Sequence, residues 1–171
     1  MKTLILFATL IFLCGFLPGE SRVMPVKNAT VRDWNPNSFW YYPWGRSGVH
    51  KGIDIFAPHG TPVRATTSGI VLYSGGYGLG GNVVYMLGAN WRFHYYAHLN
   101  ATMVSALTPV TAGELIGTVG TSGNAQGKPP HLHYTIKSAF PRFWAYDSRH
   151  YSSWNRTYYL DPGKFLQGIS Q

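Results

Sequence analysis

The chain has 171 residues, of which 45% are hydrophobic and 16% aromatic, so it is long enough for one domain with a sizeable core and too aromatic to be disordered. Only 12% of the residues are charged, and 20 glycines and 11 prolines interrupt the sequence, which argues against a helical bundle or a coiled coil. The formal net charge of +8 predicts a polyanionic partner. Because the basic residues are scattered singly, that partner is not expected to be nucleic acid.

The amino terminus has the pattern of a targeting segment. Lys2 precedes an apolar run from Leu4 to Leu17 that is too short for an ordinary membrane-spanning helix. We interpret residues 1–21 as a secretory signal peptide or, if it is not cleaved, as an N-terminal anchor that associates with a membrane. The expected location is therefore the periplasm or cell envelope, anchored or secreted. The single cysteine, Cys14, lies in this segment, so the mature domain is expected to lack disulfides and cysteine ligands.

Two aromatic stretches flank the middle of the chain. Residues 22–45 form a lead-in whose turn signals predict extended or irregular structure, and residues 137–171 form a C-terminal extension that is expected to pack back on the domain. Their rings either cover the core or wall a groove. We favour the groove, with Trp40 and Trp144 among its wall residues. One helical turn is expected at residues 164–166.

The segment between these stretches, residues 46–136, reads as a series of short strands separated by turns. We expect a hairpin in which residues 82–87 pair with residues 91–98, and a second pair formed by residues 108–114 and 115–119. No helical period is longer than two turns. The sequence therefore predicts an all-β fold, a compact single domain of short antiparallel strands.

Two histidines in the predicted strand 131–136, His131 and His133, point to the same side of that strand, with Cα atoms roughly 6.6 Å apart. One interpretation is that the two histidines simply form a half-buried polar face of the strand. The upstream cluster with His50 and Asp54 favours a metal site instead. Two neutral imidazoles and one carboxylate leave a fourth position open, the pattern of a catalytic zinc site with an activated water. Spacing alone does not decide whether His131 or His133 is the ligand.

The proton-transfer groups are expected among the remaining histidines. The motif His-Glu-x-x-His is absent, so the unused histidine of the 131/133 pair and His98 are the candidates. Alternation along the strand 91–98 predicts that His94 shares a face with His98 and so lies near the site. His59 and His150 are expected at the surface.

Four motifs follow one another in a set order: His-x-Gly-x-Asp at residues 50–54, Gly-Thr-Pro-Val at 60–63, Tyr-Ala-His-Leu at 96–99 and His-Leu-His at 131–133. In this order they resemble the lysostaphin- and LytM-type zinc endopeptidases that cut peptidoglycan cross-bridges. The resemblance covers residues 46–136.

The resemblance implies a loop-flanked groove in an antiparallel β domain, with zinc on His50, Asp54 and His133 and catalytic roles for His98 and His131. It also implies an exported zinc-dependent endopeptidase that hydrolyses peptide stems or cross-links of bacterial peptidoglycan. We expect the protein to act as a monomer.

Two departures from the family pattern affect substrate preference. Thr135 stands where members often have Glu, and the lead-in lacks the usual arginine-proline pattern. Two alternatives stay open: a non-catalytic cell-wall-binding or amidase-activating module on the same fold, and a zinc hydrolase of a secreted peptide or protein. Retention of all five site residues argues against the non-catalytic module.

Overall fold

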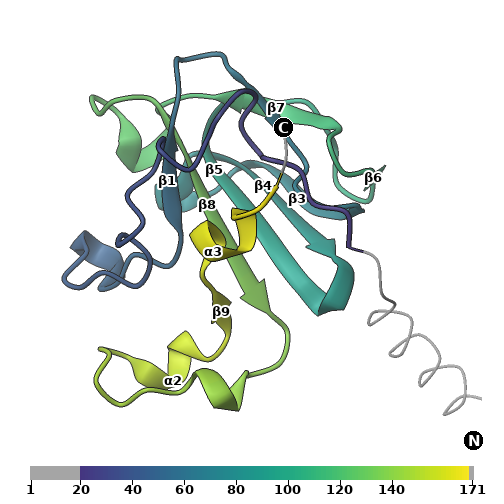
Figure 1. The fold of residues 1–171 in the computed structure, drawn as a ribbon. Helices are drawn as coiled ribbons and strands as arrows, with labels where there is room; N and C mark the ends of the chain where they lie inside the picture. Colours follow the sequence, from purple (N-terminus) through teal and green to yellow (C-terminus); the bar gives the residue numbers. More distant parts are fainter. Residues whose placement is uncertain (1–19, 170–171) are drawn as a thin grey trace, which may run out of the picture.

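The strands in the described part of the chain all join in one antiparallel sheet (Figure 1). The computed structural model describes residues 20–169, so residues 1–19 of the predicted targeting segment lie outside the described residues. Within residues 20–169 there is no helix with the length and apolar character needed to cross a membrane. The predicted all-β, antiparallel fold is confirmed.

The sheet contains nine strands, and its main path runs in the order β1-β8-β5-β4-β3-β6. Off this path, β7 pairs with β2 and β5, and β9 pairs with β8. The strands are β1 (Ile53–Phe56), β2 (Pro62–Arg64), β3 (Gly69–Gly76), β4 (Asn82–Gly88), β5 (Arg92–Thr102), β6 (Pro109–Val110), β7 (Leu115–Val119), β8 (His131–Ser138) and β9 (Tyr159–Leu160).

Helical structure is limited to single turns. The α-helices are α2 (Ser153–Arg156) and α3 (Pro162–Leu166), and the 3-10 turns are η1 (Gly45–Ser47), η2 (Gly78–Gly80), η3 (Ala89–Trp91), η4 (Gly123–Ala125) and η5 (Phe143–Ala145). The helical turn expected at residues 164–166 is part of α3. It begins at Asp161, whose carboxylate accepts hydrogen bonds from the backbone N–H groups of Gly163 and Lys164.

The strand pairing agrees with one predicted hairpin and contradicts the other. Strands β4 and β5 pair as expected across η3. The predicted pair of residues 108–114 with 115–119 is wrong, because β6 pairs with β3 and β7 pairs with β2 and β5. Hydrophobic alternation defines which face of a strand is buried but not which neighbour it meets, and here the neighbours are distant in sequence.

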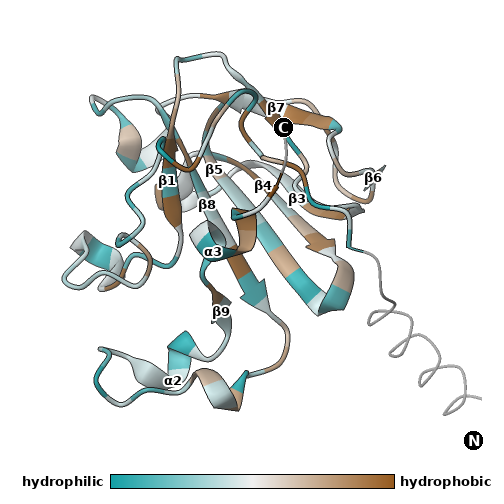
Figure 2. Ribbon diagram, viewed as in Figure 1, coloured by the Kyte–Doolittle hydropathy of each residue, from teal (hydrophilic) through white to brown (hydrophobic). Residues whose placement is uncertain are grey.

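The hydrophobic core lies on one face of the sheet and leaves the other face for polar side chains. Ile53 and Ile55 of β1 are fully buried, whereas Asp54 and Phe56 between and after them point to the opposite face. Helix α3 packs on β8 and contributes Leu166 to the core. In Figure 2 hydrophobic segments are visible in brown along β1 and on part of α3.

Trp40 was expected in a groove wall and is instead a core residue, only 5% exposed. Its indole N–H donates a hydrogen bond of 2.8 Å to the carbonyl of Tyr151, and its ring centroid is 5.3 Å from that of Tyr159. The placement of Trp40 as a wall residue is therefore wrong. The ring is buried because the two aromatic stretches pack on each other here instead of standing on separate sides of a groove.

A buried polar group lies on the core face of β5. The two ring nitrogens of His94 lie 2.7 Å from the hydroxyl of Tyr134 and 3.3 Å from the hydroxyl of Thr67. Beside them, the hydroxyl of Tyr96 accepts a hydrogen bond from the backbone N–H of Thr66. Burial lowers the pKa of His94 to about 3, so the ring is neutral in the folded protein.

This burial predicts that acid destabilises the fold through His94. The unfolded chain binds a proton at His94 with a pKa near 6.5 and the folded chain does not, so stability falls as the pH drops below that value. Between pH 7 and pH 5, His94 alone should account for about 2 kcal/mol of the lost free energy of unfolding. In His94→Gln, the free energy of unfolding measured by urea denaturation should fall by about 2 kcal/mol less between pH 7 and pH 5 than in wild type. An equal fall in the two proteins would contradict this linkage.

Candidate metal centre

The register of β1 against β8 brings the upstream and downstream motifs together. Asp54 pairs with His133, and Phe56 pairs with His131, so all four side chains lie on the sheet face opposite the core. Gly52 allows this approach. A Cβ atom at residue 52 would collide with the carbonyl oxygen of Tyr134 and lie 2.6 Å from the hydroxyl of Thr135. The central glycine of the His-x-Gly-x-Asp motif is therefore required by the close passage of β8.

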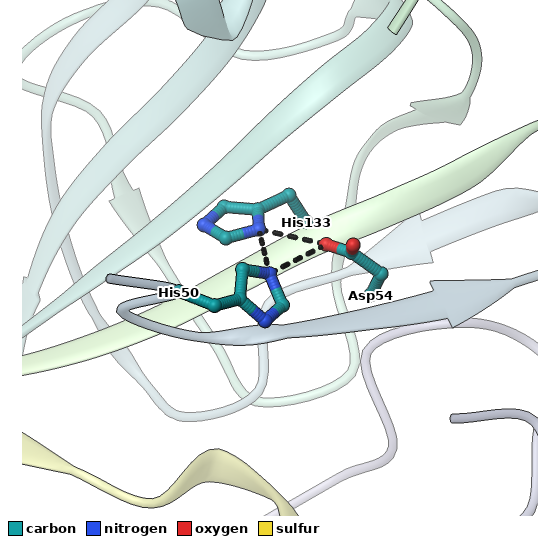
Figure 3. A group of neighbouring side chains, drawn as sticks. All are labelled: His50, Asp54 and His133. Carbon is teal, nitrogen blue, oxygen red and sulfur yellow. Dashed lines mark hydrogen bonds and ion pairs between the residues drawn. The ribbon is translucent and has the colours of Figure 1, made fainter. Parts of the chain in front are cut away.

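Three potential ligand atoms converge at this point (Figure 3). The Oδ1 atom of Asp54 lies 2.8 Å from Nδ1 of His133 and 3.1 Å from Nε2 of His50, and these two nitrogens are 3.1 Å apart. Among residues 20–169, His50, Asp54 and His133 are the group of His, Cys, Asp and Glu side chains that could hold a metal ion, with ligand atoms within 4.8 Å of one another. The chemistry of two imidazoles and one carboxylate suits zinc.

The hydrogen bonds of His50 indicate that a cation belongs between these atoms. Its Nδ1 lies 3.0 Å from the backbone carbonyl of Ser38, and a carbonyl can only accept, so Nδ1 carries the proton. In the neutral ring Nε2 then presents a lone pair, yet it faces the carboxylate oxygen of Asp54 at 3.1 Å. Two acceptors at this distance repel each other unless a proton or a metal ion lies between them. The residues present therefore fit a metal.

His98 reaches the site through a bulge in β5. Asn82 of β4 pairs with Leu99 of β5, and Val84 of β4 pairs with Tyr96 of β5. The segment between these pairs is one residue longer in β5 than in β4, which makes a β-bulge. His98 lies in this bulge with φ +62°, in the left-handed region. The expectation that His94 shares a face with His98 is therefore wrong. The bulge interrupts the alternation, so His98 turns to the metal-site face while His94 stays in the core.

His98 and His131 lie side by side at the edge of the cluster. Their ring centroids are 5.1 Å apart, and Nε2 of His131 is 4.0 Å from Oδ1 of Asp54. The Nδ1–H group of His98 donates to the carbonyl of Ser122 at 2.9 Å, and that of His131 donates to the carbonyl of Pro129 at 2.8 Å. Both rings therefore keep Nε2 free to exchange protons with a bound molecule.

Burial and hydrogen bonding set the charges of these groups. Burial by itself would raise the pKa of Asp54, but the close contacts of its carboxylate with the rings of His133 and His50 outweigh burial and hold that pKa well below its usual range. Burial lowers the pKa of His133, and it lowers the pKa of His98 to about 4. The site thus favours an ionised carboxylate on Asp54 beside a neutral imidazole on His133, the protonation states that metal ligands need.

Three further side chains contact the histidines, and motif reading did not assign them. The hydroxyl of Thr135 lies 3.1 Å from Nε2 of His133. The ring of Trp44 stacks on that of His50 with centroids 4.3 Å apart, and the ring of Phe56 lies 5.4 Å from that of His131. The alternation of β8 could have placed Thr135 beside His133. Nothing in the sequence indicates the Trp44 stack, which depends on the turn through η1.

Comparison with known proteins agrees with this geometry. The model of peptidase family M23 matches residues 48–143, a segment that contains the four histidines and the one carboxylate of the site. The L-Ala–D-Glu endopeptidase of Bacillus subtilis is 37% identical over 138 residues, which cover 74% of this chain and 42% of the relative. The DD-carboxypeptidase/endopeptidase Mpg of Neisseria meningitidis is 46% identical over 89 residues, 52% of this chain and 20% of the relative. The chain thus spans less than half the length of these relatives.

Among solved structures, the catalytic domain of lysostaphin from Staphylococcus simulans superposes with a TM-score of 0.63 at 27% sequence identity. The match covers 81% of this chain and 96% of that domain, so it includes nearly the whole catalytic domain of the relative. The resemblance indicated by the four motifs is therefore confirmed. The motif order, the antiparallel sheet and the extent of the family match show that this chain belongs to peptidase family M23.

Proposed function

We propose that the protein is an exported, monomeric zinc-dependent endopeptidase that hydrolyses peptide stems or cross-links of bacterial peptidoglycan. The observation that carries this proposal is the convergence of His50, Asp54 and His133 on one point of a sheet face that also presents His98 and His131. The printed activities of the relatives, an L-Ala–D-Glu endopeptidase and a DD-carboxypeptidase/endopeptidase, point to peptide bonds of the cell wall. The net charge of +8 suits an anionic polymer outside the cell.

The zinc ligands in this proposal are Nε2 of His50, Oδ1 of Asp54 and Nδ1 of His133. When bound, zinc supplies Lewis acidity that polarises a carbonyl oxygen and lowers the pKa of water. Each imidazole is oriented by its other nitrogen: His50 by the carbonyl of Ser38 and His133 by the hydroxyl of Thr135. The carbonyl of Ser38 fixes the proton on Nδ1 of His50 and leaves Nε2 for the metal, and the hydroxyl of Thr135 holds the orientation of the His133 ring.

The remaining two histidines handle protons. His98 is neutral near pH 7, because burial lowers its pKa to about 4, and its free Nε2 can accept a proton from the attacking nucleophile. His131, fixed by the carbonyl of Pro129, keeps its Nε2 near Asp54 and can donate a hydrogen bond to developing negative charge when protonated there. Neither ring depends on a flexible partner, since backbone carbonyls hold both.

The function is tested on defined cell-wall fragments. The purified zinc-loaded protein is incubated with stem peptides, with cross-linked muropeptide dimers and with glycine-bridged fragments, and the products are identified by mass spectrometry. At least one class should be cleaved at a single peptide bond, and a chelator should abolish cleavage until zinc is restored. Binding to sacculi without cleavage of any fragment would favour the non-catalytic cell-wall module. Cleavage confined to unrelated peptides would favour a hydrolase of secreted peptides.

The metal assignment predicts opposite effects for the two histidines of β8. His133→Ala removes a ligand and should lose zinc, as measured by elemental analysis after dialysis. His131→Ala should retain zinc and lose activity by on the order of 100-fold or more, the usual contribution of a proton-transfer group. Equal zinc content in wild type and His133→Ala would contradict the ligand assignment.

The Thr135 hydrogen bond predicts a weaker metal site when the hydroxyl is removed. Thr135→Val keeps the shape of the side chain and should weaken zinc binding about 10-fold, measured by competition with a chelator, because the His133 ring loses its orienting partner. Thr118→Val is the matched control. The hydroxyl of Thr118 is buried and has no hydrogen-bond partner within residues 20–169. Equal zinc affinities in these two variants would show that Thr135 does not orient His133.

A further inference from the structure

Five exposed rings belong to the two aromatic stretches that flank the site residues in sequence, and together we call them the aromatic surface: Tyr42, Trp144, Tyr146, Tyr151 and Trp154. We propose that this surface binds the sugar backbone of peptidoglycan and so holds the polymer next to the site that cleaves its peptides. This inference rests on the proposed function. It adds a second binding surface with a ligand of different chemistry, a carbohydrate instead of a peptide.

The exposure of these rings is high for a protein surface. Trp144 is 82% exposed and Trp154 is 63% exposed. Their rings do little for the core, since Trp154 contacts another ring of the same surface, that of Tyr146, with centroids 4.8 Å apart. Large rings exposed in such number within one short segment are unfavourable in water and mark an interaction site. Most of these rings belong to residues 139–158, which include η5 and α2 and lie beyond the end of β8 (Figure 1).

The composition of the segment indicates what kind of ligand it binds. Residues 140–158 are rich in Phe, Trp and Tyr together with Ser, Asn, Arg and His, and they contain no Leu, Ile, Val or Met. A surface that enters a membrane would carry aliphatic side chains beside its aromatic ones. A pyranose ring has a flat C–H face and a rim of hydroxyl and amide groups. Aromatic rings with polar neighbours match both parts, because the rings stack on the flat face and the polar groups bind the rim.

Residues 42–44 connect the aromatic surface to the candidate metal centre along the chain. The ring of Tyr42 stacks on that of Tyr151 with centroids 4.2 Å apart and an angle of 16° between the planes. Two residues further on, the ring of Trp44 stacks on the zinc-ligand candidate His50. A polymer lying on Tyr151 therefore has the metal centre within reach of the peptides attached to it.

The charges near the rings do not oppose an anionic polymer. The carboxylate of Asp147 lies between the exposed tryptophans in sequence and binds the guanidinium of Arg149, with Oδ2 2.7 Å from Nη2. The other carboxylates of residues 20–169 are likewise engaged: Glu20 pairs with Arg92, Asp54 belongs to the metal centre, and backbone N–H groups donate to the rest, namely Asp33, Glu114 and Asp161. The net charge of +8 makes the protein as a whole attractive to the carboxylates of the stem peptides that the sugar chain carries.

The position of these rings relative to the family match supports a separate role. The match to peptidase family M23 covers residues 48–143. Tyr42 precedes this segment, and Trp144, Tyr146, Tyr151 and Trp154 follow it. The aromatic surface is thus built from flanking sequence that packs together across the hydrogen bond from Trp40 to Tyr151, while the site residues lie inside the matched segment.

The binding test uses glycan strands from which an amidase has removed all peptides, so that no cleavage can occur. Wild-type protein should bind these strands, and the double variant Trp144→Ala/Trp154→Ala should bind about 10-fold or more weakly, the loss expected for exposed aromatic contacts. Leu107→Ala, in the loop before β6, is the control because its side chain is similarly exposed and it should bind like wild type. Equal binding by the double variant, or binding to phosphatidylglycerol vesicles with none to glycan strands, would overturn the proposal.

A cleavage test separates this inference from the proposed function. In the double variant, turnover of intact sacculi should fall more than turnover of a soluble stem peptide, whereas Leu107→Ala should lower neither. If both activities fall by the same factor, the rings act on the catalytic site and the glycan proposal is overturned. If wild type cleaves neither substrate, the proposed function fails, and the glycan-strand measurement still decides the binding proposal by itself.

Discussion

The candidate site depends on one close approach, that of β8 to the residue before β1. Gly52 has no Cβ, and this lets the backbone of Tyr134 pass where a side chain would otherwise stand. The resulting register places Asp54 opposite His133 and Phe56 opposite His131. A shift of one residue would turn Asp54 into the core and Ile55 out of it. Burial of Ile53 and Ile55 therefore fixes the face on which the Asp54 carboxylate lies. The hydrophobic packing that stabilises β1 thus also positions the candidate metal centre.

A second constraint is the way the histidines are held. His50, His98 and His131 each donate from Nδ1 to a backbone carbonyl, those of Ser38, Ser122 and Pro129. These carbonyls belong to the segments that lead into the strands, and they fix the orientation of the three rings through one nitrogen each. His133 differs, since its partner is the side chain of Thr135. The presence of Thr where the family frequently has Glu therefore changes a group that contacts His133, a proposed metal ligand.

Much of the site was predictable from the sequence because its residues lie in short motifs with firm local geometry. Alternation along β8 put His131 and His133 on one face, and the motif order added His50, Asp54 and His98; their catalytic and ligand roles stay predictions. The face of His94 was predicted wrongly, because a bulge adds one residue to β5 without leaving a mark in the hydrophobic pattern. The pairing of β6 and β7 and the burial of Trp40 depend on contacts between distant segments, and local propensity does not encode these.

The left-handed backbone of His98 has a consequence for how this protein can evolve. A non-glycine residue in this region costs roughly 1 kcal/mol, and glycine occupies it without strain. A substitution of His98 by glycine would thus relax the chain at the position that the resemblance assigns to catalysis. The backbone of the bulge therefore does not by itself require an imidazole at this position, and the proposed chemistry of His98 is what such a change would remove.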